Sequence, residues 1–123
     1  MIAADTSAWI DYSKGQKSKQ SDCLETVLND GTLVMPLPVL FEILSGPGLT
    51  AEARQLIIQL PRLDALPAYW ERAGDLRQSL LKKGLKARSM DCLIAQNCID
   101  HGVSLIATDA DYRHFVRSGL KLI

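Results

Sequence analysis

The sequence lacks the cysteine patterns that identify small disulfide-stapled or zinc-binding proteins. Its three cysteines, Cys23, Cys92 and Cys98, show no Cys-x-x-Cys or Cys-x-x-His spacing. An odd number of isolated cysteines argues against a disulfide framework and against a structural zinc site. We expect all three to be reduced, small side chains in the core or at its boundary.

Long apolar runs are also missing. The longest, residues 33–41, is interrupted by Pro36 and Pro38, and it is far shorter than the roughly 20 residues that span a bilayer. The first residues lack the basic start and the apolar stretch of a signal peptide. We therefore expect no membrane partner and a cytoplasmic location.

Neither sign of charge is in excess, because 14 Lys and Arg residues balance 14 Asp and Glu residues. Overall charge therefore argues neither for nor against a polyanionic partner. Aromatic residues make up 6% of the chain and do not alternate with basic ones, so no base-stacking surface is predicted. Lys82, Lys83, Lys86 and Arg88 form a local basic cluster that could attract phosphates or complement the end of a helix.

What is present is the pattern of an α/β protein. With 123 residues and 47% apolar content, the chain fits a single domain, 1–123, with one core. Apolar runs predict strands at 1–4, 32–35, 63–66, 103–107 and 120–123. Helical periodicity predicts helices at 6–12, 23–30, 40–44, 51–60, 68–83, 89–100 and 108–116. This alternation predicts a three-layer α/β/α sandwich with a mainly parallel central sheet.

Four acidic residues, Asp5, Glu42, Asp91 and Asp109, occupy informative positions in this pattern, and three of them lie at junctions between a strand and a helix. Ligands of open parallel sheets gather at the carboxyl ends of the strands. We therefore expect these four carboxylates to lie close together at one edge of the sheet.

Each acid also has a purely structural explanation. Asp5 could be a helix N-cap, while Asp91, following a Ser89 cap, and Asp109 could favour the positive ends of their helices. Glu42 is harder to explain in this way, because it is the only charged residue between Met35 and Ala51. A buried, unpaired carboxylate costs several kcal/mol. Its partner must come from elsewhere in the fold, and a bound cation is one candidate.

Four carboxylates in one pocket would oppose folding unless their charge were neutralised. Two of them about 4 Å apart repel by roughly 4 kcal/mol at an effective dielectric constant near 20. A divalent cation removes this cost, and a set of oxygen ligands favours Mg²⁺ or Mn²⁺. The two histidines, His101 and His114, are not spaced with these acids as a transition-metal triad. We expect them at the surface or at helix ends.

Several segments, taken in order along the whole chain, resemble the metal-dependent PIN-domain ribonucleases and, within that family, the VapC-type toxins of bacterial toxin-antitoxin pairs. The segments are Asp5-Thr6-Ser7, residues 38–44, residues 90–95 and residues 108–112. The resemblance implies that Asp5, Glu42, Asp91 and Asp109 are the catalytic, metal-binding acids. Thr6 or Ser7 would be a polar neighbour.

The same resemblance implies an activity and a set of partners. It implies a Mg²⁺- or Mn²⁺-dependent endoribonuclease that hydrolyses RNA phosphodiester bonds as the toxin of a type II toxin-antitoxin system. The partners would be RNA, a cognate small antitoxin and a second copy of the chain in a homodimer. Apolar residues around Phe41, Leu44, Leu49 and Ile57 could supply a contact surface or belong to the core.

Two positions in the last motif need separate interpretation. Asp111 matches an acidic position common in the family, but we interpret it as part of a helix cap with Thr108. Ala107 departs from the family pattern, in which Thr or Ser is common at the end of this strand. The departure removes one hydroxyl from the implied site and leaves the four carboxylates unchanged.

Two other functions share parts of this pattern. A phosphoacceptor signalling domain would need adjacent acids after the first strand and a lysine after a late strand, and the sequence has neither. A catalytically degenerate PIN scaffold would act by binding a protein partner. Covalent catalysis by Ser7 is disfavoured, because no histidine is predicted near it to activate the hydroxyl.

Overall fold

Strands alternate with helices along the chain in the computed structural model, which describes residues 1–123. The strands are β1 (Ile2–Ala4), β2 (Met35–Pro36), β3 (Arg62–Leu63), β4 (Ser104–Ile106) and β5 (Lys121–Leu122). The helices are α1 (Thr6–Ser13), α2 (Lys19–Asp30), α3 (Leu37–Ser45), α4 (Ala51–Ile58), α5 (Tyr69–Lys82), α6 (Ser89–His101) and the 3₁₀ helix η1 (Ala110–Ser118). The predicted α/β alternation is confirmed.

All strand pairs in the sheet are parallel. One group has the order β1-β4-β5, with Ala3 opposite Leu105, and the other pairs β2 with β3. A parallel bridge between Ile2 and Leu33 joins the two groups, so the strands run in the order β3-β2-β1-β4-β5. The chain leaves β1 in one direction and returns to its other side at β4. Open α/β sheets bind ligands beyond the carboxyl ends of the two strands at which the order reverses, which here are β1 and β4.

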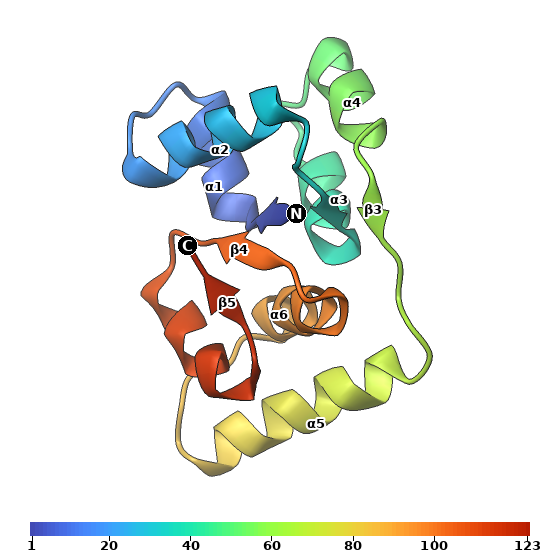
Figure 1. Ribbon diagram of the computed structural model, residues 1–123, viewed down its shortest axis with the longest axis vertical. Coiled ribbons are helices and arrows are strands. Elements are labelled where there is room, and N and C mark those ends of the chain that lie inside the picture. The colour runs from blue at the N-terminus through green and yellow to red at the C-terminus, as the bar shows by residue number, and fades with distance from the viewer.

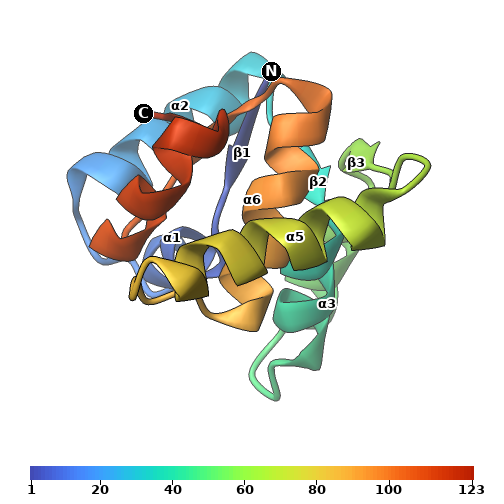
Figure 2. The same cartoon turned by 90° about the horizontal axis from the view of Figure 1, so that it is seen from below.

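Helices cover both faces of this sheet. Figure 1 shows α1 and α2 on one side of the strands and α6, with α5 outside it, on the other. Figure 2 shows β1 running between the α1–α2 pair and α6. One cluster of 26 buried residues forms the core between the layers. The predicted three-layer sandwich is confirmed.

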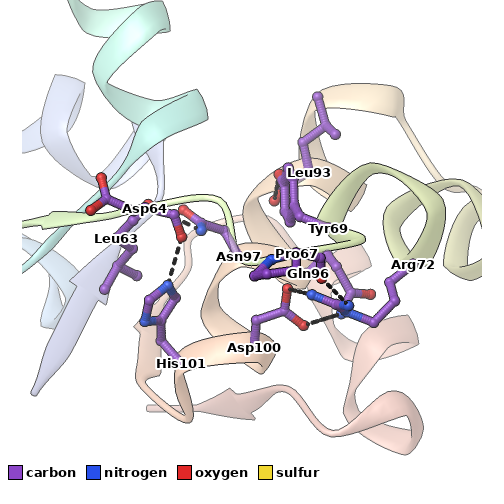
Figure 3. Close-up of polar contacts among 10 residues, drawn as sticks. All are labelled: Leu63, Asp64, Pro67, Tyr69, Arg72, Leu93, Gln96, Asn97, Asp100 and His101. Carbon is purple, nitrogen blue, oxygen red and sulfur yellow. Dashed lines mark hydrogen bonds and ion pairs between the residues drawn. The ribbon is translucent and has the colours of Figure 1, made fainter.

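Helix α6 is held to its neighbours by polar contacts (Figure 3). Arg72 of α5 donates from Nε and Nη2 to the two oxygens of Asp100, at 3.0 and 2.6 Å, and Gln96 donates to Asp100 Oδ1 at 2.8 Å. At its C-terminus α6 ends at Gly102, whose φ of 64° is a conformation that glycine adopts without strain.

Asn97 of α6 makes the most deeply buried of these contacts. Its side chain is 1% exposed; its Oδ1 accepts from the Leu37 N–H at 3.1 Å, and its Nδ2 donates to the Leu63 carbonyl at 3.2 Å. Leu37 is the first residue of α3, and Leu63 is the last of β3. One side chain thereby fixes α6 against the segments on either side of it.

Several predicted boundaries were wrong by a few residues. Helix α2 begins earlier, at Lys19, because Ser18 and Ser21 form a reciprocal capping box that the apolar pattern does not reveal. Ser89 was expected to cap α6, but it is the first helical residue, and the cap position is occupied by Arg88 without a side-chain bond. Strands β2 and β3 are two residues each, and β2 includes Pro36.

The cysteines are free, as predicted, with Cys92 and Cys98 buried and Cys23 half-buried. None of the helices combines the length and the apolar character that crossing a membrane would require.

Candidate active site

Asp5 lies where β1 ends and α1 begins. Its Oδ1 accepts a hydrogen bond from the Ala8 N–H at 2.8 Å, which makes Asp5 the N-cap of α1. Its Oδ2 accepts from the Thr108 N–H at 3.2 Å, just beyond β4. The residue is 2% exposed. A single carboxylate therefore joins the ends of the two strands that flank the reversal of strand order.

Burial has a measurable electrostatic cost at Asp5. Desolvation raises its pKa to about 6, the two backbone hydrogen bonds act against this rise, and the charges of Asp91 and Asp109 add to it. The capping explanation is therefore correct but incomplete. A simple surface cap would not be buried beside two other carboxylates.

Glu42 is half-buried in the middle of α3. Its partner is the Thr6 hydroxyl, which donates to Oε1 at 2.5 Å. The expectation of a partner from a distant part of the fold is confirmed. The Glu42 side chain is only partly removed from solvent. Of the two predicted polar neighbours, Thr6 makes the contact and Ser7 is exposed.

Asp91 lies in the first turn of α6 and is half-buried. Burial raises its pKa, and the Asp109 and Glu42 charges raise it further, whereas a hydrogen bond from Tyr112 and the charge of Arg88 lower it. The Tyr112 hydroxyl donates to Asp91 Oδ1 at 3.2 Å.

The sequence analysis did not predict this contact of Tyr112. Burial, followed by the neighbouring carboxylates, raises the pKa of Tyr112 well above its usual value. The one signal in the sequence is spacing, because Tyr112 follows Asp109 by a single helical turn.

Asp109 is the N-cap of η1 and accepts from the Asp111 N–H at 2.8 Å. The predicted cap of Thr108 with Asp111 was therefore wrong, since the capping side chain is that of Asp109. The Asp111 carboxylate instead lies 3.6 Å from Lys86 Nζ. It is directed to the basic loop between α5 and α6.

The fold brings the four acids into one electrostatic neighbourhood. Asp5 is coupled to Asp91 and Asp109, and Asp91 is coupled in turn to Asp109 and Glu42. As the side chains are placed, no three His, Cys, Asp or Glu residues are close enough together to hold a metal ion. The donor set consists of carboxylate and hydroxyl oxygens, which suits a hard divalent cation.

The basic cluster borders this neighbourhood. Lys82, Lys83, Lys86 and Arg88 are all exposed. Arg88 occupies the cap position of α6, and its charge lowers the pKa of Asp91. Arg88 therefore supplies positive charge beside Asp91, and Lys82 complements the end of α5.

Neither histidine forms a hydrogen bond with the four acids. His101, at the end of α6, contacts the Asp64 carbonyl at 2.8 Å, and His114 of η1 contacts the Lys86 carbonyl at 3.0 Å. Both are half-buried, and neither bonds to Ser7.

An apolar groove of about 290 Å³ lies between α3, α5 and α6. Phe41 and Trp70 line it and are 63% and 67% exposed. Of the apolar residues considered as a contact surface, only Phe41 is freely exposed. Leu44 and Leu49 pack partly against the core, and Ile57 is buried.

The fold and these acids define the class of the protein. The PIN domain family matches residues 2–117, and the chain belongs to this family. The chain is 31% identical over 119 residues to the VapC ribonuclease Mb1587 of Mycobacterium bovis and equally to Ribonuclease VapC11 of Mycobacterium tuberculosis. Each match covers 91% of this chain and 89% of the relative.

A solved structure agrees with this assignment at the level of fold. The crystal structure of VapBC2 from Rickettsia felis bound to a DNA fragment from their promoter matches with a TM-score of 0.72 and 23% identity. The match covers 100% of this chain and 98% of that one. The arrangement of strands and helices described above is thus that of the PIN fold.

Proposed function

We propose that this protein is a metal-dependent endoribonuclease that hydrolyses RNA phosphodiester bonds as the toxin of a type II toxin-antitoxin system, acting in the cytoplasm. The observation that carries the proposal is the convergence of Asp5, Glu42, Asp91 and Asp109 at the reversal of strand order. Relatives that are 31% identical over most of their length are named VapC ribonucleases.

The four carboxylates would hold Mg²⁺ or Mn²⁺. PIN-domain ribonucleases generally use divalent metals, and the all-oxygen donor set fits these two ions. The raised pKa of Asp5 supports the assignment, because a nearby cation would offset the cost of keeping that buried carboxylate charged. The single domain, residues 1–123, would contain the complete acidic set.

The protein's contribution to catalysis follows from its contacts. A divalent cation would supply polarisation of the phosphoryl oxygen and a lowered pKa for water. Asp5 is held by two backbone donors and Glu42 by Thr6, so hydrogen bonds restrict the movement of both carboxylates. Arg88 and its neighbouring lysines would attract the phosphates of the substrate, an attraction that salt weakens.

Two protein partners belong to the proposal: a cognate small antitoxin and a second copy of the chain. The match to a VapBC complex supports the antitoxin, and the exposed Phe41 and Trp70 rings offer an apolar surface for protein contact. Measuring the mass of the protein alone and with the product of an adjacent small reading frame would test both. A Phe41→Ser variant that changes neither assembly would exclude this groove as the contact.

Cleavage of RNA is the direct test of the activity. Purified protein should cut RNA in the presence of Mg²⁺ or Mn²⁺ and stop in excess EDTA. Asp91→Asn should fold and lose cleavage, whereas Asp75→Asn, at an exposed position of α5, should cut like the wild type. Cleavage that persists in EDTA would refute the metal-dependent mechanism. A folded wild-type protein that cuts no RNA would favour the degenerate scaffold.

A further inference from the structure

Tyr112 is the only residue whose side chain donates a hydrogen bond to Asp91. It belongs to η1, whereas Asp91 begins α6, so the contact joins two elements that approach the acidic neighbourhood separately. The Tyr112 N–H also bonds to the Asp109 carbonyl at 3.3 Å. One residue is thus bonded to Asp91 through its side chain and to Asp109 through its backbone.

The Tyr112 ring has little freedom to move. It is 2% exposed and packs against Phe115, with ring centroids 5.8 Å apart. A hydroxyl at the end of a fully packed ring points in a fixed direction. The half-buried Asp91 side chain would otherwise be free to choose between rotamers.

We infer that Tyr112 is a positioning residue for the metal-dependent reaction, whose hydroxyl orients the Asp91 carboxylate and leaves its second oxygen available to a cation. The inference rests on the proposed function. A phenol suits this task because it is a neutral donor. It fixes the carboxylate without cancelling the negative charge that a cation needs, as a lysine or arginine would.

Hydrogen-bond partners of metal ligands have effects that exceed their own small contribution to stability. Their removal commonly lowers metal affinity or activity by about 10- to 100-fold. A hydrogen bond with a merely structural role would instead affect folding whether or not a metal ion is bound. This difference separates a positioning role from a merely structural one.

The chain contains a matched control for this test. Tyr69 is 4% exposed, and its hydroxyl donates to the Leu93 carbonyl at 2.7 Å. Tyr112→Phe and Tyr69→Phe therefore each remove one hydroxyl from a buried ring and one hydrogen bond. Only the first hydrogen bond ends on one of the four acids.

Mn²⁺ affinity, measured calorimetrically without RNA, distinguishes the two variants. Tyr112→Phe should bind Mn²⁺ about tenfold more weakly than the wild type, and Tyr69→Phe should remain within about twofold. Thermal unfolding in EDTA should show similar small losses for both. In RNA cleavage, Tyr112→Phe should need more Mn²⁺ for half-maximal rate and recover part of its activity when Mn²⁺ is raised.

A second variant guards against a folding defect. Replacing Tyr112 with 4-aminophenylalanine keeps a donor at the same ring position and should restore Mn²⁺ affinity. Equal affinity in Tyr112→Phe and wild type, or no rescue by the amine, would overturn the inference and leave the proposed function intact. A wild-type protein that binds no Mn²⁺ would overturn both.

Discussion

The Thr6 hydroxyl and Glu42 Oε1 lie 2.5 Å apart although 36 positions separate the two residues in sequence. Thr6 begins α1 immediately after Asp5, and Glu42 lies on α3. The hydrogen bond therefore joins the neighbour of one proposed metal ligand to another ligand. It also gives a half-buried carboxylate a neutral partner in place of a counter-charge.

Thr6→Val should test this relationship, because valine keeps the shape of the side chain and removes the donor. A hydrogen bond to a charged group is worth about 1.5–3 kcal/mol. If Glu42 depends on it for orientation, Mn²⁺-dependent RNA cleavage should fall by about tenfold or more. Thr6→Ser should retain most activity, and Ser7→Ala, at an exposed position, should retain all of it. Full activity in Thr6→Val would show that Glu42 needs no orienting partner.

Stability without metal should fall as pH rises from about 4 to 7. The folded-state pKa of Asp5 is raised from 3.8 to about 6, so its contribution is fully present below pH 3.8 and is lost as pH rises through about 6. The shift corresponds to about 3 kcal/mol. Asp91, whose pKa is also raised, acts in the same direction.

Urea unfolding in EDTA at pH 5 and 7.5 measures this effect. Mn²⁺ should stabilise the protein more at pH 7.5 than at pH 5, where protons compete for the carboxylates. Asp5→Asn should flatten the profile, although it also loses one of two accepted hydrogen bonds. A free energy of unfolding that rises across this range in EDTA would contradict the electrostatic account.

Asp100 should produce the opposite pH dependence in more acidic solution. The hydrogen bonds from Arg72, the largest cause, lower its pKa below 3.8. Its contribution is therefore present above pH 3.8 and is lost as pH falls through the lower folded-state value. Asp100→Asn should destabilise the protein at pH 7, and this loss of stability should shrink as the pH falls below 3.8. A loss that is the same at pH 7 and in acidic solution would mean that packing, rather than charge, explains the effect.

Asn97→Ala should be among the most damaging changes outside the acids. It would leave the partly buried Leu37 N–H and the buried Leu63 carbonyl without their partner, at a cost of about 2–4 kcal/mol from two unsatisfied groups. Urea denaturation at pH 7 measures the loss, with Gln78→Ala, at an exposed position, as the control. A loss below about 1 kcal/mol would show that water replaces the side chain.

Much of the fold could be predicted because the hydrophobic periods and the glycine and proline positions are local signals. Gly102 ends α6 where the sequence indicates, and α4 ends at Ile58, shortly before Pro61. The predicted helix boundaries were wrong where a side chain outside the periodic apolar pattern determines the end of the helix. Ser18 and Ser21, which cap the start of α2, are the example. The 3₁₀ character of η1 gave no recognisable signal.

For the site, the sequence predicted which acids the topology brings together but not how each is held. Strand ends are placed by chain order, so Asp5 and Asp109 could be assigned to one edge. The donors from Thr6 and Tyr112 depend on the packing of whole helices against one another. Trp70 shows the same limit, because its spacing within α5 predicts a buried face and the structure leaves it 67% exposed.

The two hydrogen bonds accepted by Asp5 have a consequence for how a harmful enzyme of this design could be silenced by mutation. Replacing Asp5 removes a proposed ligand and also removes the hydrogen bond that joins the ends of the first and fourth strands, so such mutations should yield poorly folded protein. Mutations of Glu42 or Asp91 leave that hydrogen bond intact. Some cells should survive expression of the protein because they carry spontaneous mutations in it. Among those that still make soluble protein, mutations of Glu42 and Asp91 should therefore be far more frequent than mutations of Asp5.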